Sequence, residues 1–415
     1  MRAWHMFGVL TVTLLVVRAS VAAEFVVEVA AGAQDRANTT IHFDLPASAA
    51  SGDWALVCEA TGERCPAQRV DEGKSAAVFI LTERLPAGSA RRYELRPDDA
   101  RTDKVECLDD GRQLVLRSLG REVLAYQHAT VESPAGIDPL YRRSGQIHPL
   151  LTPAGHVVSD DFPPDHAHQH GLFFAWVNTT LGDRHLDFWN QADRSGAIEH
   201  AAIKRLTSGP VFGEFQVVLK HLDVTSAEPR GVLDELWTVR AYATDDRFIV
   251  DLESSQTCVG DALTINEYHY GGMGLRGSRA WYDDKIAKNA SPDPERSGHF
   301  AFTTNEGLER LAGNHTRPKW VSLTGQIDGQ FADVTVLGHP TNFRFPQPVR
   351  LHPNKPYFCF APMVLGEFQI DSSKPYVSRY RLVIRDGELD QQANALAWGD
   401  YADPPLARVI EAGGE

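Results

Sequence analysis

Apolar and polar residues alternate along much of the chain, as they do in β-strands that have one buried and one solvated face. The clearest alternating runs are residues 212–224, 235–242, 248–253 and 379–384. Turns separate such runs, since the chain contains 33 glycines and 24 prolines. We therefore predict antiparallel strands that pack one face against a core.

One segment has the spacing of a helix instead. In residues 389–398 the apolar positions fall on one helical face, and Asp390 can cap the first turn. We predict a short C-terminal helix that lies on a sheet.

A domain boundary is expected near residue 100. Residues 24–97 contain several short strand-like runs, which suit a small β-sandwich, and a polar stretch, residues 98–103, follows them. The remainder of the chain is long enough for a large two-sheet structure. The predicted fold class is all-β, with a small N-terminal β-sandwich over 24–100 and a large antiparallel β-sandwich over 101–415.

The first residues have the pattern of a secretory signal. Arg2 supplies the positive charge, residues 8–17 are apolar, and small residues at 20–23 suit signal peptidase. We predict cleavage after residue 23, and the alternative is an uncleaved N-terminal anchor. No later stretch approaches the ~20 apolar residues of a membrane helix. The protein is therefore expected in the periplasm or outside the cell, with no membrane span in the mature chain.

The net charge is −14, and no cluster of basic residues is present. This argues against nucleic acid and anionic membranes as partners, because both need a basic surface. Among the five cysteines, Cys58 and Cys65 are close enough for a local disulfide in an exported protein. Five free thiols are the alternative, and the sequence leaves both open.

The sharpest chemical feature is a concentration of histidine. Six of the sixteen histidines lie within residues 144–189, and His166, His168 and His170 alternate. In an extended segment, residues two apart share a face at roughly 7 Å. Such imidazoles can contact a substrate, exchange protons or bind a metal, with Asp165 as a nearby carboxylate. The structural alternative is a polar loop.

Aromatic residues follow the histidines. Carbohydrate sites combine aromatic faces with polar side chains. Trp189, beside Asn190 and Gln191, is interpreted as an exposed platform for a sugar, whereas Phe173 and Phe174 are better explained as core residues.

Two further segments carry polar groups among residues that restrain the backbone. In residues 266–276, Glu267 and His269 are two apart, glycines follow, and Arg276 can bind a carboxylate or hydroxyl pair; a glycine-rich turn is the alternative. In residues 338–348, His339, Asn342 and Arg344 lie among prolines, which can hold polar groups rigidly.

Together these segments resemble the PmoA-like family of exported bacterial proteins, whose function is not established. The matching stretches are His148-Pro149, Asp160–Gly171, Gly271–Arg276 and His339–Pro346. Where that family has His-His-Arg-Gly, this chain has His168-Gln169-His170-Gly171, so a role for that arginine does not carry over. The resemblance implies a large β-sandwich similar to the galactose-mutarotase-like supersandwich. The label of methane oxygenase, sometimes given to the family, does not suit a chain without membrane helices.

The leading hypothesis is a carbohydrate-active enzyme that uses acid/base chemistry of the lyase, hydrolase or epimerase type. The rivals are a non-catalytic glycan-binding protein and a histidine–metal enzyme. The expected ligand is a carbohydrate or another small polar molecule, and the sequence names no cofactor and assigns no metal ligand. The residues expected to be catalytic are His168, His170, Glu267 and His339. Those expected to bind substrate are Asp165, His166, Trp189, His269, Arg276, Asn342 and Arg344.

Overall fold

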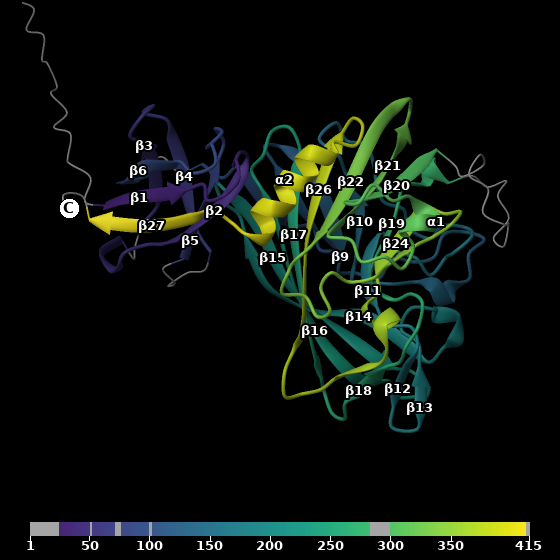
Figure 1. Cartoon of the computed structure of the whole chain (residues 1–415). Coiled ribbons are helices and arrows are strands. Elements are labelled where there is room, and N and C mark those ends of the chain that lie inside the picture. The colour runs from purple at the N-terminus through teal and green to yellow at the C-terminus, as the bar shows by residue number, and fades with distance from the viewer. Residues whose placement is uncertain (1–24, 50–51, 71–75, 99–101, 283–298, 412–415) are drawn as a thin grey trace, which may run out of the picture.

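The computed structural model describes residues 25–49, 52–70, 76–98, 102–282 and 299–411. Within them the chain is almost wholly antiparallel β-structure (Figure 1), and the longest helix is α2 (Gln391–Ala402). This confirms the predicted all-β class. The predicted signal segment, residues 1–23, lies outside the described residues.

Two eight-stranded sheets form the large domain and enclose one hydrophobic core. The first sheet contains, in spatial order, β14 (Gly196–Thr207), β15 (Phe212–Asp223), β16 (Arg230–Tyr242), β17 (Phe248–Cys258), β26 (Tyr376–Asp386), β22 (Gln330–Gly338), β21 (Trp320–Ile327) and β20 (Phe300–Thr304). The second contains β23 (Val349–Leu351), β24 (Tyr357–Phe360), β19 (Gly272–Arg276), β11 (Leu172–Ala175), β10 (Gln146–Leu150), β9 (Arg121–Gln127), β8 (Gln113–Ser118) and β7 (Val105–Asp109). The predicted large antiparallel β-sandwich is confirmed.

The predicted alternation sets which residues face this core. In β17 every second residue from Phe248 to Cys258 is buried, as the period of a half-buried strand requires. The aromatic residues after the histidine cluster also point inward: Phe173, Phe174, Trp176 and Phe188 are at most 1% exposed. The interpretation of Phe173 and Phe174 as core residues is confirmed.

A four-stranded sheet extends the large domain at the lower end of Figure 1. Its spatial order is β13 (Arg184–Leu186), β12 (Thr179–Leu181), β18 (Leu263–Ile265) and β25 (Phe368–Ile370).

The N-terminal part is a separate seven-stranded sheet with its own core. The strands at the two ends of its order contact each other, so the sheet curls around that core. The spatial order is β2 (Thr39–Asp44), β5 (Ala76–Leu81), β4 (Arg64–Arg69), β3 (Trp54–Cys58), β6 (Ala90–Pro97), β1 (Phe25–Ala30) and β27 (Leu406–Glu411).

The last strand corrects the expected domain boundary. We expected residues 101–415 to form the large domain, but β27 pairs along its whole length with β1 of the N-terminal sheet. Ala407 and Val409 alternate along β27 and pack against the N-terminal core. The chain therefore returns to its first domain after completing the second.

The predicted C-terminal helix is present as α2. The Asp390 carboxylate accepts a hydrogen bond from the Ala393 backbone N–H at 2.9 Å and caps the first turn. On the packed face, Trp398 and Tyr401 lie against Trp320 and Val383 of the first large sheet. Leu396, which we expected on that face, is 42% exposed, whereas the neighbouring Ala397 packs against the sheet as expected.

All five cysteines are buried free thiols, so the structure follows the alternative without a Cys58–Cys65 disulfide. Burial, with a smaller contribution from the charge of Glu63, raises the pKa of Cys65 to about 11. Among the described residues, no helix is both long and apolar enough to cross a membrane.

Candidate functional site

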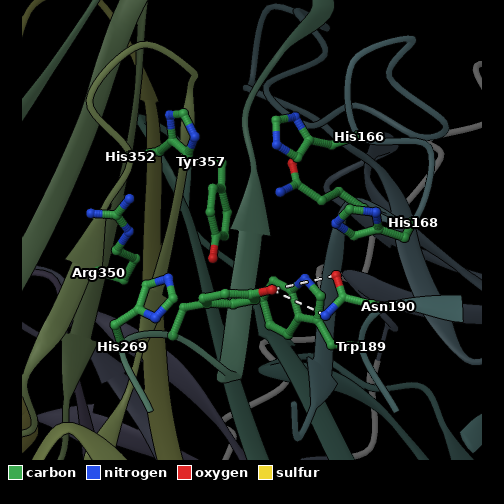
Figure 2. Close-up of a pocket in the computed structure, with 10 residues that line it drawn as sticks. His166, His168, Trp189, Asn190, His269, Arg350, His352 and Tyr357 are labelled. Atoms are coloured by element: carbon green, nitrogen blue, oxygen red, sulfur yellow. Dashed lines mark hydrogen bonds between the residues drawn. The ribbon is translucent and has the colours of Figure 1, made fainter. Parts of the chain in front are cut away.

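A pocket of about 220 Å³ lies where several loops of the second large sheet meet. Figure 2 shows His166 and His168 on one side and His269, Arg350 and His352 on the other, with Tyr357 between them. The remaining lining residues are Gln169, Trp189, Asn190 and Tyr270. The loop before β11, the loop before β19 and the β23–β24 hairpin thus contribute to one site.

The histidine segment reaches the pocket through a series of turns, which corrects the expected extended geometry. The backbone N–H of His166 donates to the carbonyl oxygen of Pro163, and the backbone N–H of Gln169 donates to the carbonyl oxygen of His166. The rings of His166 and His168 remain neighbours, with centroids 5.6 Å apart. His170 turns away into the protein and is fully buried.

Gly171 allows this loop to enter β11. Its φ is +58°, and a Cβ there would lie 2.1 Å from the carbonyl oxygen of Ile147. A side chain would therefore collide with the backbone of β10 in a conformation that is already unfavourable for any other residue.

Asp165 lies beneath the pocket at the centre of a charged cluster. Its carboxylate is 2.7 Å from His166 Nδ1, 3.1 Å from Arg276 Nη2 and 3.7 Å from Lys355 Nζ. Burial by itself raises the pKa of Asp165, but the hydrogen bond from His166 and the charges of Arg276 and Lys355 outweigh it and hold this pKa well below its usual range. Asp165 is therefore ionised and orients the His166 ring.

Arg276 supports this cluster without reaching the pocket. Its side chain is completely buried and donates to Asp165 and, at 3.0 Å, to Gln169 Oε1. The predicted roles of Asp165 and Arg276 as direct substrate contacts are therefore replaced by a supporting role, since neither lines the pocket.

His352 faces His166 across the pocket, with ring centroids 5.6 Å apart. Burial, and then the charges of His166 and Arg350, lower the pKa of His352 to about 3, so the ring is neutral at neutral pH. Its Nδ1 accepts a hydrogen bond from the Asn354 backbone N–H at 3.1 Å. The single ring proton must then be on Nε2.

Aromatic rings form the floor of the pocket. The ring centroid of Trp189 lies 4.6 Å from that of Phe173 and 5.6 and 5.8 Å from those of Tyr270 and Tyr357. Trp189 is 0% exposed, so the predicted exposed platform is wrong: the residue lines the site from within the core. The Tyr270 hydroxyl accepts a hydrogen bond from Asn190 Nδ2 at 3.0 Å (Figure 2).

The described lining contains one permanent charge, that of Arg350, and no carboxylate. Arg350 Nη1 donates to Asn314 Oδ1 at 3.2 Å, which leaves further N–H groups for a ligand. Burial, followed by the charges of Arg350 and His315, also lowers the pKa of His269. The pocket thus offers hydrogen-bond donors, neutral imidazoles and a cation.

Three of the four residues predicted to be catalytic lie elsewhere: His170, Glu267 and His339. His170 is held by Asp161 Oδ1 at 2.6 Å and by Gln191 Oε1 at 3.1 Å, and it lies behind the pocket wall. Glu267 is exposed and does not line the pocket, whereas His269, two residues further along, does.

The segment after β22 is also remote from the pocket. His339 lies against Tyr401, with ring centroids 4.9 Å apart, in a separate depression beside Arg379. Asn342 bonds the backbone N–H and C=O of Arg379, and Arg344 donates to three carbonyls of residues 362–367. These roles are structural, because the side chains satisfy backbone groups of neighbouring segments.

The sequence did not single out Arg350, His352 or Tyr357. The sequence nevertheless contains a signal, which is a repeated histidine–proline pair. His352-Pro353 directly follows the short strand β23, and His148-Pro149 lies in β10. Within the part of the chain that is described, no group of three or more His, Cys, Asp or Glu side chains is arranged to hold a metal ion.

A family model described as a family of unknown function, DUF6807, matches residues 113–399. No curated protein matches the chain. Among solved structures, the chain is similar to an alpha-mannosidase from Enterococcus faecalis V583, with a TM-score of 0.46 and 10% identity over 95% of this chain. The match covers 46% of the mannosidase, so the chain spans about half of that protein's length.

Proposed function

The chain belongs to the DUF6807 family, whose function is unknown, and we propose that it is an enzyme that transfers protons on a small carbohydrate bound in the pocket. One observation carries the proposal: a carboxylate-oriented imidazole, His166, faces a second imidazole, His352, that is held neutral.

His166 is the general base in this proposal. Its Nδ1 donates to the ionised carboxylate of Asp165, so Nε2 is the ring nitrogen left to accept a proton. A buried carboxylate behind an imidazole fixes its orientation and stabilises the imidazolium that forms. Arg276 and Lys355 keep that carboxylate charged.

His352 is the opposing hydrogen-bond donor. With Nδ1 engaged by Asn354 and the ring neutral, Nε2–H can stabilise negative charge that develops on a substrate oxygen. The base and the donor therefore keep different protonation roles at the same pH, which is the arrangement that proton transfer requires.

The rest of the pocket suits one sugar unit. The Tyr270 ring, supported from behind by Trp189, can pack against sugar C–H groups, while Asn190 and His168 are placed at the wall to bind hydroxyls. Arg350 can pair with a ring substituent that carries negative charge.

The lining favours some reactions over others. Hydrolysis by two paired carboxylates needs two Asp or Glu side chains beside the sugar, and none lines the described pocket. Proton removal by imidazole, as in epimerases and lyases, needs the groups that are present. Together with the secretory pattern of residues 1–23, this leads us to propose an exported epimerase or lyase.

The test is turnover of neutral hexoses, uronic acids and their oligomers in D₂O, followed by NMR. We expect deuterium at a sugar carbon, or an unsaturated product. His166→Asn should lower the rate by about 10²–10⁴ while leaving the melting temperature unchanged. The matched control is His185→Asn, because His185 is exposed on β13, away from the pocket.

Other outcomes separate the rivals. Binding without any turnover would replace the enzyme by a glycan-binding protein. Activity lost on treatment with a chelator and restored by a divalent metal would replace imidazole chemistry by metal chemistry.

A further inference from the structure

A second cavity, of about 660 Å³, opens on the side of the histidine loop away from the first pocket. Its walls come from residues 128–144, residues 191–200 and Val224. The 3-10 turn at Gln191–Asp193 separates the two sites: Asn190 lines the first pocket, while Gln191 lines the second and bonds His170.

Arg143 lines this cavity and is only 3% exposed. Its backbone is fixed by a bridge to Val131, and its guanidinium lies 5.3 Å from the centre of the Phe173 ring. The Nε and Nη2 atoms have no hydrogen-bond partner among the described residues. Buried guanidinium nitrogens without acceptors destabilise the folded state, so a ligand that accepts hydrogen bonds from Arg143 would gain binding free energy there.

The two carboxylates whose charges act most strongly on Arg143, those of Asp161 and Glu235, already have other hydrogen-bond partners. Burial lowers the pKa of Arg143 to about 10, and Asp161 and Glu235 oppose that shift only through their charges. Asp161 is bound by His170 at 2.6 Å, and Glu235 by His221 at 2.8 Å and Trp237 at 2.7 Å. Arg143 is therefore a protonated, buried cation without an ion-pair partner among the described residues.

The rim of the cavity combines cations with hydroxyl-binding groups. Arg142 and Arg194 are exposed there, as are Glu132 and Glu199. The two glutamates oppose a polyanion such as phosphate, yet they can accept hydrogen bonds from hydroxyls. A ligand with one acidic group and several hydroxyls fits both features.

We propose that this cavity binds an acidic sugar, in which a carboxylate pairs with Arg143 and the hydroxyls bond the polar rim. The inference goes beyond the proposed function, because the cavity shares no lining residue with the first pocket and stands whether or not that pocket is catalytic.

Calorimetric titration of the full chain with galacturonate and glucuronate, against galactose and glucose, tests the proposal. We expect the uronates to bind at millimolar concentrations and the neutral sugars at least about tenfold more weakly, since a charge-assisted pair is lost. Arg143→Met should abolish uronate binding. Arg194→Ala, a change at an exposed position, should weaken it without affecting folding.

Several results would overturn the proposal. Uronate binding that survives Arg143→Met, or that is lost instead in Arg350→Ala, would assign the ligand to the first pocket. Equal binding of neutral sugars would remove the role of the carboxylate. Binding of inorganic phosphate but of neither uronate would make this a simple anion site, and binding of no probe would leave Arg143 a structural residue. If Arg143→Met fails to fold, Arg142→Ala combined with Arg194→Ala decides between these outcomes.

Discussion

Burial lowers the pKa of several histidines, among them His352, His200 and His42, and each of these makes stability depend on pH. The pKa of His352 is lowered to about 3 and that of His200 to about 4, from 6.5, in both cases chiefly by burial. His200 also shares a hydrogen bond of 3.0 Å with the Tyr126 hydroxyl. Below pH 6.5 these histidines become protonated in the unfolded chain but stay neutral in the folded chain.

We therefore predict that the melting temperature falls as the pH drops from about 6.5 towards 3, measured by circular dichroism across that range. The variant His352→Gln should show a shallower fall, because its side chain cannot take up a proton. The exposed His185, changed to Gln, serves as the control and should leave the slope as it is in the parent chain. A parallel fall in His352→Gln would contradict this explanation.

Arg276 and Arg279 pair with two aspartates of the histidine segment, and the two arginines differ in exposure. The Arg276 side chain is 0% exposed beside Asp165, whereas the Arg279 side chain is 49% exposed and pairs with Asp160 at 2.7 Å. Removal of Arg276 leaves a buried carboxylate without its buried partner, whereas water can enter the site of the half-exposed Arg279 side chain and solvate Asp160, whose own side chain is 6% exposed.

Arg276→Met should accordingly lower the free energy of unfolding by roughly 3–5 kcal/mol, and Arg279→Met by less, because water can take the place of the half-exposed Arg279 side chain. Urea denaturation of both variants measures the difference. Equal losses would mean that the cluster around Asp165 does not depend on burial.

At the scale of elements, the strands of the large sheets could be predicted because their signal is local. The run at 212–224 appears as β15 (Phe212–Asp223), and the capped run at 389–398 appears within α2. The partner of β27 could not be predicted, because it lies near the opposite end of the sequence. Alternation specifies a strand but not the strand beside it.

The same distinction explains which site residues the sequence indicated. His166, His168 and His269 do line the pocket, and each belongs to a segment with an unusual local composition. His352 meets His166 only because β23 and β24 lie in the same sheet as β11, which no local pattern reveals. The turns of residues 163–169 likewise separate His170 from its neighbours.

The strand β27 forms the outer edge of the N-terminal sheet, so its loss should expose β1. We predict that truncation after Asp403 lowers hydrogen-exchange protection of β1 and promotes association, since an unpaired edge strand can pair with other chains. Mass spectrometry of exchanged peptides and light scattering measure the two effects. Truncation after residue 411 keeps β27 and should change neither.

At the scale of the whole molecule, Gln68 is one of the side chains that join the N-terminal domain to the large domain. Gln68 of β4 accepts hydrogen bonds from the backbone N–H groups of Val211 and Phe212, both at 2.9 Å, and donates to the Phe212 carbonyl at 3.0 Å. A Cβ at Gly209 would lie 2.2 Å from the Gln68 Oε1 atom, so any other residue there would displace the Gln68 amide. Val78 adds an apolar contact to Phe212.

Gln68→Ala would leave three buried backbone groups without partners. We predict a loss of about 1–3 kcal/mol in the free energy of unfolding, and faster proteolysis between the two domains. Gln326→Ala, at an exposed position of β21, is the matched control. If Gln68→Ala unfolds and is cleaved like the parent chain, water satisfies these groups and the domains are joined by other contacts.

The closure of the N-terminal sheet by β27 also imposes an order on biosynthesis. A ribosome makes β1 first, yet the strand that completes its sheet is made only after both large sheets. The N-terminal domain must wait with one edge open while the second domain is still being translated. If the chain is exported, as its first residues predict, the factors that keep secretory chains from aggregating must protect the open edge of the N-terminal sheet until β27 has been made.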